Sequence, residues 1–166
     1  MVTAMMLGKQ NLVFFADALF EKAGQQCSVL LATDDFDFLH CSIGPKPTPE
    51  IFFSALSAIG KKAVESSWPF VVLTEATSVY CQKPNQTISL DEILHKQKMK
   101  MHHIPFHSRN INPSRKIMEQ VRQEILDSRF IERDDQFQDV ESALEKIRYG
   151  GTRQYFEELW VKRREI

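Results

Sequence analysis

The C-terminal third of the chain constrains its fold most, because it carries a sustained helical pattern. Residues 114–130 read SRKIMEQVRQEILDSRF and residues 143–160 read ALEKIRYGGTRQYFEELW, with apolar side chains three and four positions apart. The pair Gly150–Gly151 interrupts the second stretch and separates two helices. We predict two or three amphipathic helices here, the longest of them capped by Ser114.

The N-terminal segment, residues 11–23, also has apolar side chains at helical spacing. Leu12, Phe15 and Leu19 fall on neighbouring turns, and Gly24 follows as a stop signal. The spacing therefore predicts an amphipathic helix at the start of the domain.

Short apolar or alternating runs between these ends predict β-strands. Residues 27–32 fit a strand or a helix, and the alternation at residues 36–41 favours a strand. Three more strands are predicted, at residues 69–73, 78–82 and 99–106, the last at a sheet edge because it contains a proline.

Two further helices are predicted from their caps. Thr48 with Pro49 starts one that runs to about residue 64, and Ser89 with Glu92 forms a capping box for a short one. Helices and strands mixed in this way predict one α/β domain over residues 1–166, with a mixed central sheet surrounded by helices.

Bulk composition excludes several classes of protein. The formal net charge of −1 argues against binding polyanions by overall attraction, and three widely spaced cysteines argue against a disulfide framework. No signal peptide and no apolar run of membrane-spanning length occurs, so we expect an intracellular protein without a membrane partner.

One segment is strongly basic. Residues 95–116 contain no acidic side chain, and their basic residues are candidates for RNA or phosphate contact: Lys96, Lys98, Lys100, Arg109, Arg115 and Lys116. A solvated face or a protein interface would explain the same charges. Four histidines fall in this segment or just at its start, but none has an acidic neighbour to share a metal ion: His95, His102, His103 and His107.

Acidic and thiol groups give weaker candidates. Asp34, Asp35 and Asp37 could hold a divalent cation, although an Asp-rich turn explains them as well. Glu75 follows an apolar strand, where a nuclease could keep an acid, and polar residues also end strands for ordinary reasons. No cysteine has a local activating pattern.

Four segments, read in order, resemble the cap-snatching endonuclease domain of the polymerase acidic subunit of orthomyxoviruses. They are ATDDFDFL, PFVVLTEATSVYCQKPN, the long helix SRKIMEQVRQEILDSRF and the closing ALEKIRYGGTRQYFEEL. The resemblance covers roughly residues 26–160. It implies a PD-(D/E)xK nuclease-like fold, a place at the N-terminal end of a longer viral RNA polymerase subunit, and partners among the other subunits in the host nucleus.

The resemblance also implies a decayed metal site. The family binds manganese through a histidine and acidic groups, but those positions fall on Gln26, Ile43 and Val72 here, and only Lys83 matches, at the catalytic lysine. Apolar side chains cannot ligate a hard cation. We therefore expect no metal, no catalysis, and a structural or RNA-contacting role.

Two alternatives stay open. The first is an active manganese- or magnesium-dependent RNA endonuclease whose ligands lie elsewhere, with Glu65, Glu75 and the Asp34–Asp37 segment as candidates. The second is a non-enzymatic binding protein such as an immunity protein, which needs no motif.

Overall fold

The computed structural model of the chain describes residues 10–22, 24–46, 48–75, 90–105, 110–127 and 136–162. The elements run in the order β1 (Asn11–Lys22), β2 (Gln25–Thr33), β3 (Phe38–Gly44), α2 (Pro49–Glu65), β4 (Phe70–Glu75), α4 (Leu90–Lys96), β5 (Met99–Ile104), α5 (Pro113–Asp127), α6 (Gln136–Gly150) and α7 (Arg153–Lys162). No helix among the described residues is long and apolar enough to cross a membrane.

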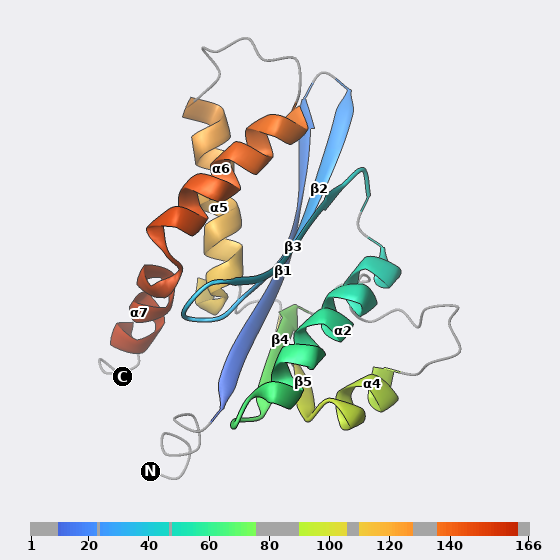
Figure 1. The fold of residues 1–166 in the computed structure, drawn as a ribbon. Helices are drawn as coiled ribbons and strands as arrows, with labels where there is room; N and C mark the ends of the chain where they lie inside the picture. Colours follow the sequence, from blue (N-terminus) through green and yellow to red (C-terminus); the bar gives the residue numbers. More distant parts are fainter. Residues whose placement is uncertain are drawn as a thin grey trace.

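The strands form one five-stranded mixed sheet in the order β3-β2-β1-β4-β5 (Figure 1). The first three strands are antiparallel neighbours, whereas β4 runs parallel to β1 and β5 runs parallel to β4. Gly24 turns the chain from β1 into β2 with a φ of 78°, a left-handed conformation that favours glycine. The predicted mixed sheet with surrounding helices is confirmed.

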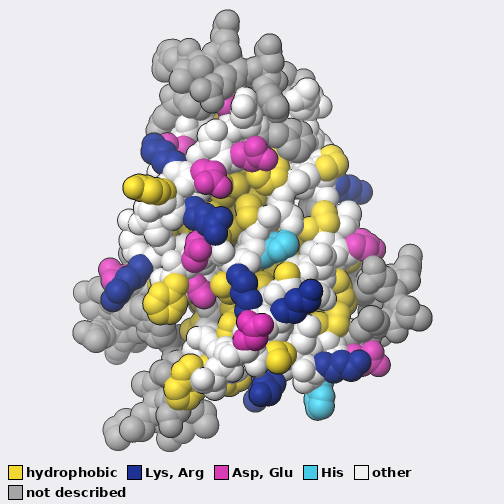
Figure 2. Space-filling model, in the orientation of Figure 1, with side chains coloured by type: hydrophobic (Ala, Val, Ile, Leu, Met, Phe, Trp, Pro, Cys, Tyr) yellow, Lys and Arg dark blue, Asp and Glu magenta, His cyan; other side chains and the backbone are white. Residues whose placement is uncertain are grey.

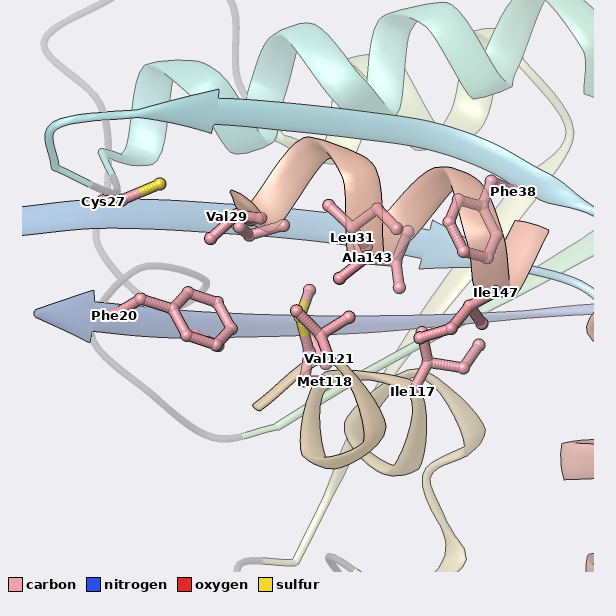
Figure 3. Packing of buried hydrophobic residues seen from close by; sticks show 14 residues of the cluster. Phe20, Cys27, Val29, Leu31, Phe38, Ile117, Met118, Val121, Ala143 and Ile147 are labelled. Atoms are coloured by element: carbon pink, nitrogen blue, oxygen red, sulfur yellow. The ribbon is translucent and has the colours of Figure 1, made fainter. Parts of the chain in front are cut away.

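Helices cover both faces of the sheet. On one face α2 packs Phe52, Leu56 and Ile59 against Val13 and Phe15 of β1, and α4 lies beside it. On the other face α5 and α6 bury apolar side chains against β1, β2 and β3, as Figure 3 shows for Met118, Val121 and Ile147. The result is a helix–sheet–helix sandwich with β1 at its centre.

The segment at residues 11–22 is a strand, so the predicted helix is wrong. Val13 and Phe15 face α2, whereas Phe14, Ala16 and Ala18 face the opposite layer. A central strand is buried on both faces and therefore reads as a nearly continuous apolar run, in which helical spacing occurs by chance.

Most other elements follow their prediction. Residues 25–33 are a strand, which decides between the two possibilities for that segment. Thr48 caps α2 by accepting a hydrogen bond from the amide of Ile51 at 3.4 Å, and β5 is an edge strand. The predicted strand at residues 78–82 lies outside the described residues, as does the predicted cap Ser89.

Candidate functional site: a buried carboxylate joined to Arg115

Strand β1 is longer than its neighbour β4, and the candidate site lies where β4 ends and β1 continues. Their parallel pairing runs from Asn11–Phe70 to Phe14–Leu73, so β1 continues beyond the end of β4. Ligand sites in open α/β sheets form outside the carboxyl ends of parallel strands. Glu75, the last residue of β4, lies at this place and is only 1% exposed.

The first turn of α5 is fixed to β1 by Asn112. Its side-chain oxygen accepts hydrogen bonds from the amides of Ser114 at 3.0 Å and Arg115 at 3.3 Å, which is the geometry of an N-cap. Its side-chain nitrogen donates to the carbonyl of Phe15 at 2.9 Å. Asn112 is therefore the cap, and the prediction that Ser114 caps this helix is wrong.

Ser114 instead joins a buried hydrogen-bond chain. Its hydroxyl donates to the carbonyl of Phe14 at 2.7 Å, and the hydroxyl of Thr33 lies 2.7 Å from the same oxygen. Because the only hydroxyl hydrogen of Ser114 goes to Phe14, Thr33 must be the donor in the second bond. Both side chains are fully buried, so this chain ties the start of α5 to β1 and β2.

Arg115 follows directly and binds Glu75 through two parallel hydrogen bonds. Its Nε donates to Oε1 at 3.0 Å and its Nη2 donates to Oε2 at 2.5 Å. Two-pronged guanidinium–carboxylate pairs are among the stronger hydrogen bonds in proteins. Both carboxylate oxygens of Glu75 are therefore engaged.

Asp17 of β1 completes the arrangement. Arg115 Nη1 donates to the Asp17 backbone carbonyl at 2.5 Å, and Nη2 lies 4.0 Å from the Asp17 carboxylate. One guanidinium thus lies between two carboxylates that β1 and β4 bring together. We call these three residues, Asp17, Glu75 and Arg115, the Arg115 cluster.

The Arg115 cluster as arranged does not fit a divalent metal ion. Such ions need open oxygen ligands, and both oxygens of Glu75 already accept hydrogen bonds from a positively charged group. Within the described ranges, no three His, Cys, Asp or Glu residues are grouped so that they could hold a metal.

The predicted basic residues differ in how exposed they are. Lys96, Lys98 and Lys100 are exposed at the end of α4 and along β5, whereas Arg115 is 17% exposed and engaged with Glu75. Lys116 is half-buried on α5. The remaining predicted residues of this kind, Arg109 and the catalytic candidate Lys83, lie outside the described residues.

The positions implied by the polymerase resemblance are not brought together. Gln26 is exposed near the start of β2, Ile43 lies on β3, and Val72 is buried in the core beside α2. Two strands separate β3 from β4, so these positions do not share a site.

Several of the other candidates make local contacts where they are described. Asp34 accepts hydrogen bonds from the amides of Phe36 and Asp37 at 2.9 Å each, which is an Asp-containing turn. Asp37 pairs with Arg148 of α6 at 3.1 Å. His103 is hydrogen-bonded to the Thr74 hydroxyl at 2.8 Å, and His95 and His102 are exposed.

Sequence reasoning missed Asp17 and the role of Arg115. Asp17 is an isolated acid inside the apolar run FFADALF, a pattern that could have marked a buried, paired charge. It was hidden because that run was interpreted as a helix. Arg115 was grouped with the basic segment, and only the tertiary structure brings it to Glu75.

Comparisons with known proteins place this fold. No protein-family model and no curated protein sequence matches the chain. The catalytic domain of Mos1 mariner transposase superimposes with a TM-score of 0.65 at 11% identity, over 89% of this chain and 74% of that one. The same catalytic domain with raltegravir and Mn gives 0.66 at 11% identity, over 89% and 75%.

A larger assembly gives the same result. The Mos1 strand transfer complex matches with a TM-score of 0.64 at 10% identity, over 93% of this chain and 52% of that chain. At such low identity the similarity establishes the fold alone. The chain therefore has a nuclease-like fold similar to that of transposase catalytic domains, whereas the sequence resemblance had indicated a polymerase endonuclease.

Proposed function

We propose that this chain is a nuclease-like domain that does not cut nucleic acid and that acts through structure or binding. One observation carries the proposal: Arg115 occupies both carboxylate oxygens of Glu75, the buried acid at the carboxyl end of β4. Metal-dependent nucleases need acidic oxygens free to hold the cations that activate water and stabilise the leaving group. Here those oxygens are hydrogen-bonded to a cation of the protein itself.

The comparison structures support the contrast. Two of them contain the Mos1 catalytic domain with Mg or with Mn. This chain has the same type of fold, but the guanidinium of Arg115 lies between the carboxylates of Asp17 within β1 and Glu75 at the end of β4. We therefore infer that metal chemistry has been replaced here by an internal ion pair.

Cleavage assays test this proposal directly. We expect no cutting of labelled single-stranded RNA or DNA in 1 mM Mn²⁺ or Mg²⁺ above the level of a Glu75→Gln control. Cleavage that requires Mn²⁺ and is lost in both Glu75→Gln and Asp17→Asn would overturn the proposal, and would favour the active-endonuclease alternative.

Contact with RNA is the binding role that we propose. Lys96, Lys98 and Lys100 are exposed close together in sequence at the α4–β5 turn, beside a sheet edge. On the face of the molecule that Figure 2 shows, charges of both signs are interspersed. Changing the three lysines to Glu should weaken RNA binding and flatten its salt dependence, whereas changing the exposed Lys46, Lys61 and Lys62 should have a smaller effect.

The wider assignment rests on the sequence resemblance. It proposes a domain of a viral polymerase acidic subunit that assembles with other polymerase subunits in the host nucleus. Co-purification with those subunits would support it. A tight complex with an unrelated protein, and none with polymerase subunits, would favour the binding-protein alternative.

A further inference from the structure

We propose that the outer edge of strand β3 binds an extended segment of a partner protein, as an added strand whose alternate side chains are basic. In the sheet order β3-β2-β1-β4-β5, strand β3 pairs with β2 on one side. No other strand in the described part of the chain pairs with its outer side. Backbone N–H and C=O groups on that side can therefore pair with another chain, which is the chemistry of β-strand addition.

The sequence of β3 lacks the charged residues and prolines that usually protect an edge strand. Residues 38–44 read FLHCSIG, with no proline and no Lys, Arg, Asp or Glu. The opposite edge strand, β5, contains the exposed Lys100 and runs into Pro105. Because charges and prolines normally block pairing at an edge, their absence from β3 favours a partner there. An irregularity in the pairing at Ala32 and Thr33 restricts the regular part of this edge to residues 40–44.

Helix α6 makes one side of this edge acidic. Arg148 of α6 pairs with Asp37, directly before β3, at 3.1 Å. Glu145 and Glu141 lie one and two turns earlier on the same side of the helix and are exposed, so they follow the strand. Burial raises the pKa of the Cys41 thiol, in the middle of β3, to about 11, and the charges of Glu141 and Glu145 contribute to this rise while that of Arg148 opposes it. Since Arg148 is already paired, the two glutamates leave this side of the edge negative.

Helix α2 makes the other side of the edge basic. It covers the face of the sheet opposite to α6. Burial lowers the pKa of His40 in β3, and the nearby charge of the exposed Lys62 of α2 lowers it further. Successive side chains of a strand point to opposite faces, so every second residue of an added strand would face Glu141 and Glu145 and the others would face Lys62. Basic side chains at alternate positions therefore suit this edge, whereas a uniformly basic segment does not.

The same charges argue against a second copy of this chain as the partner. In an antiparallel pair of β3 strands around a two-fold axis, the α6 helices of both copies would lie on the same face of the joined sheet. Glu141 and Glu145 would then approach the same residues of the other copy, and Lys62 would approach Lys62. Like charges brought together disfavour association, so a partner of complementary charge fits this edge better.

The test uses the wild-type protein and a fluorescent peptide of the length of β3 in which lysine alternates with threonine. We expect the peptide to bind, measured by anisotropy, and to slow amide hydrogen exchange in residues 40–44, because strand pairing protects those amides. A peptide of the same composition with its lysines grouped, and one with alternate backbone nitrogens methylated, should each bind at least about tenfold more weakly. Equal binding of the methylated peptide, or no protection of residues 40–44 at about 1 mM peptide, would overturn the proposal.

Charge reversal on the protein tests the acidic side of the edge. Glu141→Lys with Glu145→Lys should weaken binding of the alternating peptide at least about tenfold. The matched control is Asp91→Lys with Glu119→Lys, at exposed positions on α4 and α5, and it should change binding by less than about twofold. Equal weakening by the two pairs would overturn the proposal.

Two further outcomes are decided by the wild-type protein alone. If Glu141→Lys with Glu145→Lys does not fold, hydrogen exchange of the wild type with the alternating and methylated peptides decides the question. Self-association of the wild type that protects residues 40–44 without any peptide would overturn the choice of a basic partner segment, and would make a second copy the occupant. None of these measurements involves nucleic acid or its cleavage, so the proposed function stands or falls separately.

Discussion

Asn112 and Phe15 are joined by a 2.9 Å hydrogen bond across 97 positions of sequence, from the cap of α5 to the central strand β1. The same side chain also caps the helix through its oxygen. One buried amide thus fixes both the start of α5 and its position on the sheet. Because Arg115 lies on that first turn, Asn112 also positions the guanidinium against Glu75.

Replacing Asn112 should therefore destabilise the whole domain. Asn112→Ala leaves a buried carbonyl and two helix-start amides without their partner, so we expect a loss of about 1–3 kcal/mol in the free energy of unfolding. Urea denaturation measures this loss. The exposed Asn110 supplies the matched control, and an equal effect of Asn110→Ala would contradict the role given to the cap.

The Arg115–Glu75 pair should show strong energetic coupling. Removing one partner of a buried pair leaves an uncompensated charge, so Arg115→Met should cost about 3–5 kcal/mol. The double variant Arg115→Met with Glu75→Gln should lose less stability than the sum of the losses of the two single variants. We expect the difference to be about 0.5–3 kcal/mol. A double-mutant cycle measures the coupling.

An exposed pair of the same chemistry gives the comparison. Arg153 and Glu157 lie one helical turn apart on α7, at 3.0 Å, with both side chains mostly exposed. Their coupling should not exceed about 0.5 kcal/mol. Equal coupling in the two pairs would show that Glu75 is not buried as described.

Stability should fall as His40 becomes protonated. Burial, with a smaller contribution from Lys62, lowers the pKa of His40 below its ordinary value of 6.5. The unfolded chain therefore binds the proton more tightly than the folded one, and stability is lost as the pH falls from 6.5 toward the lower folded-state pKa. Unfolding free energies at pH 7.5 and 5.5 should differ less in His40→Gln than in the wild-type protein, and an unchanged difference would contradict the assignment to His40.

Asp37 should stabilise the folded protein in a way that depends on pH in the acidic range, as expected for a paired carboxylate. The hydrogen bond from Arg148 lowers the pKa of Asp37 below its ordinary value of 3.8. Its contribution is therefore present above about pH 4 and lost as the pH falls through the folded-state pKa. Both side chains are half-exposed, so the effect should stay below about 1 kcal/mol.

A pair of variants checks that assignment. Asp37→Asn and Arg148→Gln should flatten the loss of stability between pH 5 and pH 3 to a similar extent. The pKa of Asp35 is shifted in the opposite direction, because burial raises it. Asp35→Asn should therefore not reproduce the flattening. If only one of the two partners changes the pH dependence, the pair is not its source.

The sequence predicts the helices of the fold better than it predicts the central strand β1. Amphipathic patterns such as that of α5 report a single buried face, so they identify a helix directly. Strand β1 is buried on both faces, and its run of apolar residues has no single period to read. The element on which the whole sheet is built was therefore predicted wrongly.

The Arg115 cluster could be predicted only in part. Glu75 was recognised as an acid at a strand end, but the sequence does not show that Asp17 lies beside it or that Arg115 reaches both. The decisive contacts join residues 40 and 98 positions apart. Local patterns carry no information on such pairing, because it depends on strand order and on where β4 stops.

Calorimetric titration of the wild-type protein with Mn²⁺ tests the central claim most directly. With Arg115 on both oxygens of Glu75, we predict no saturable binding at metal concentrations up to about 1 mM, where a micromolar site would give a clear signal. A stoichiometric Mn²⁺ site that disappears in Glu75→Gln would contradict the claim. It would show that Mn²⁺ displaces the Arg115 guanidinium from Glu75, and that the domain has a functional metal site.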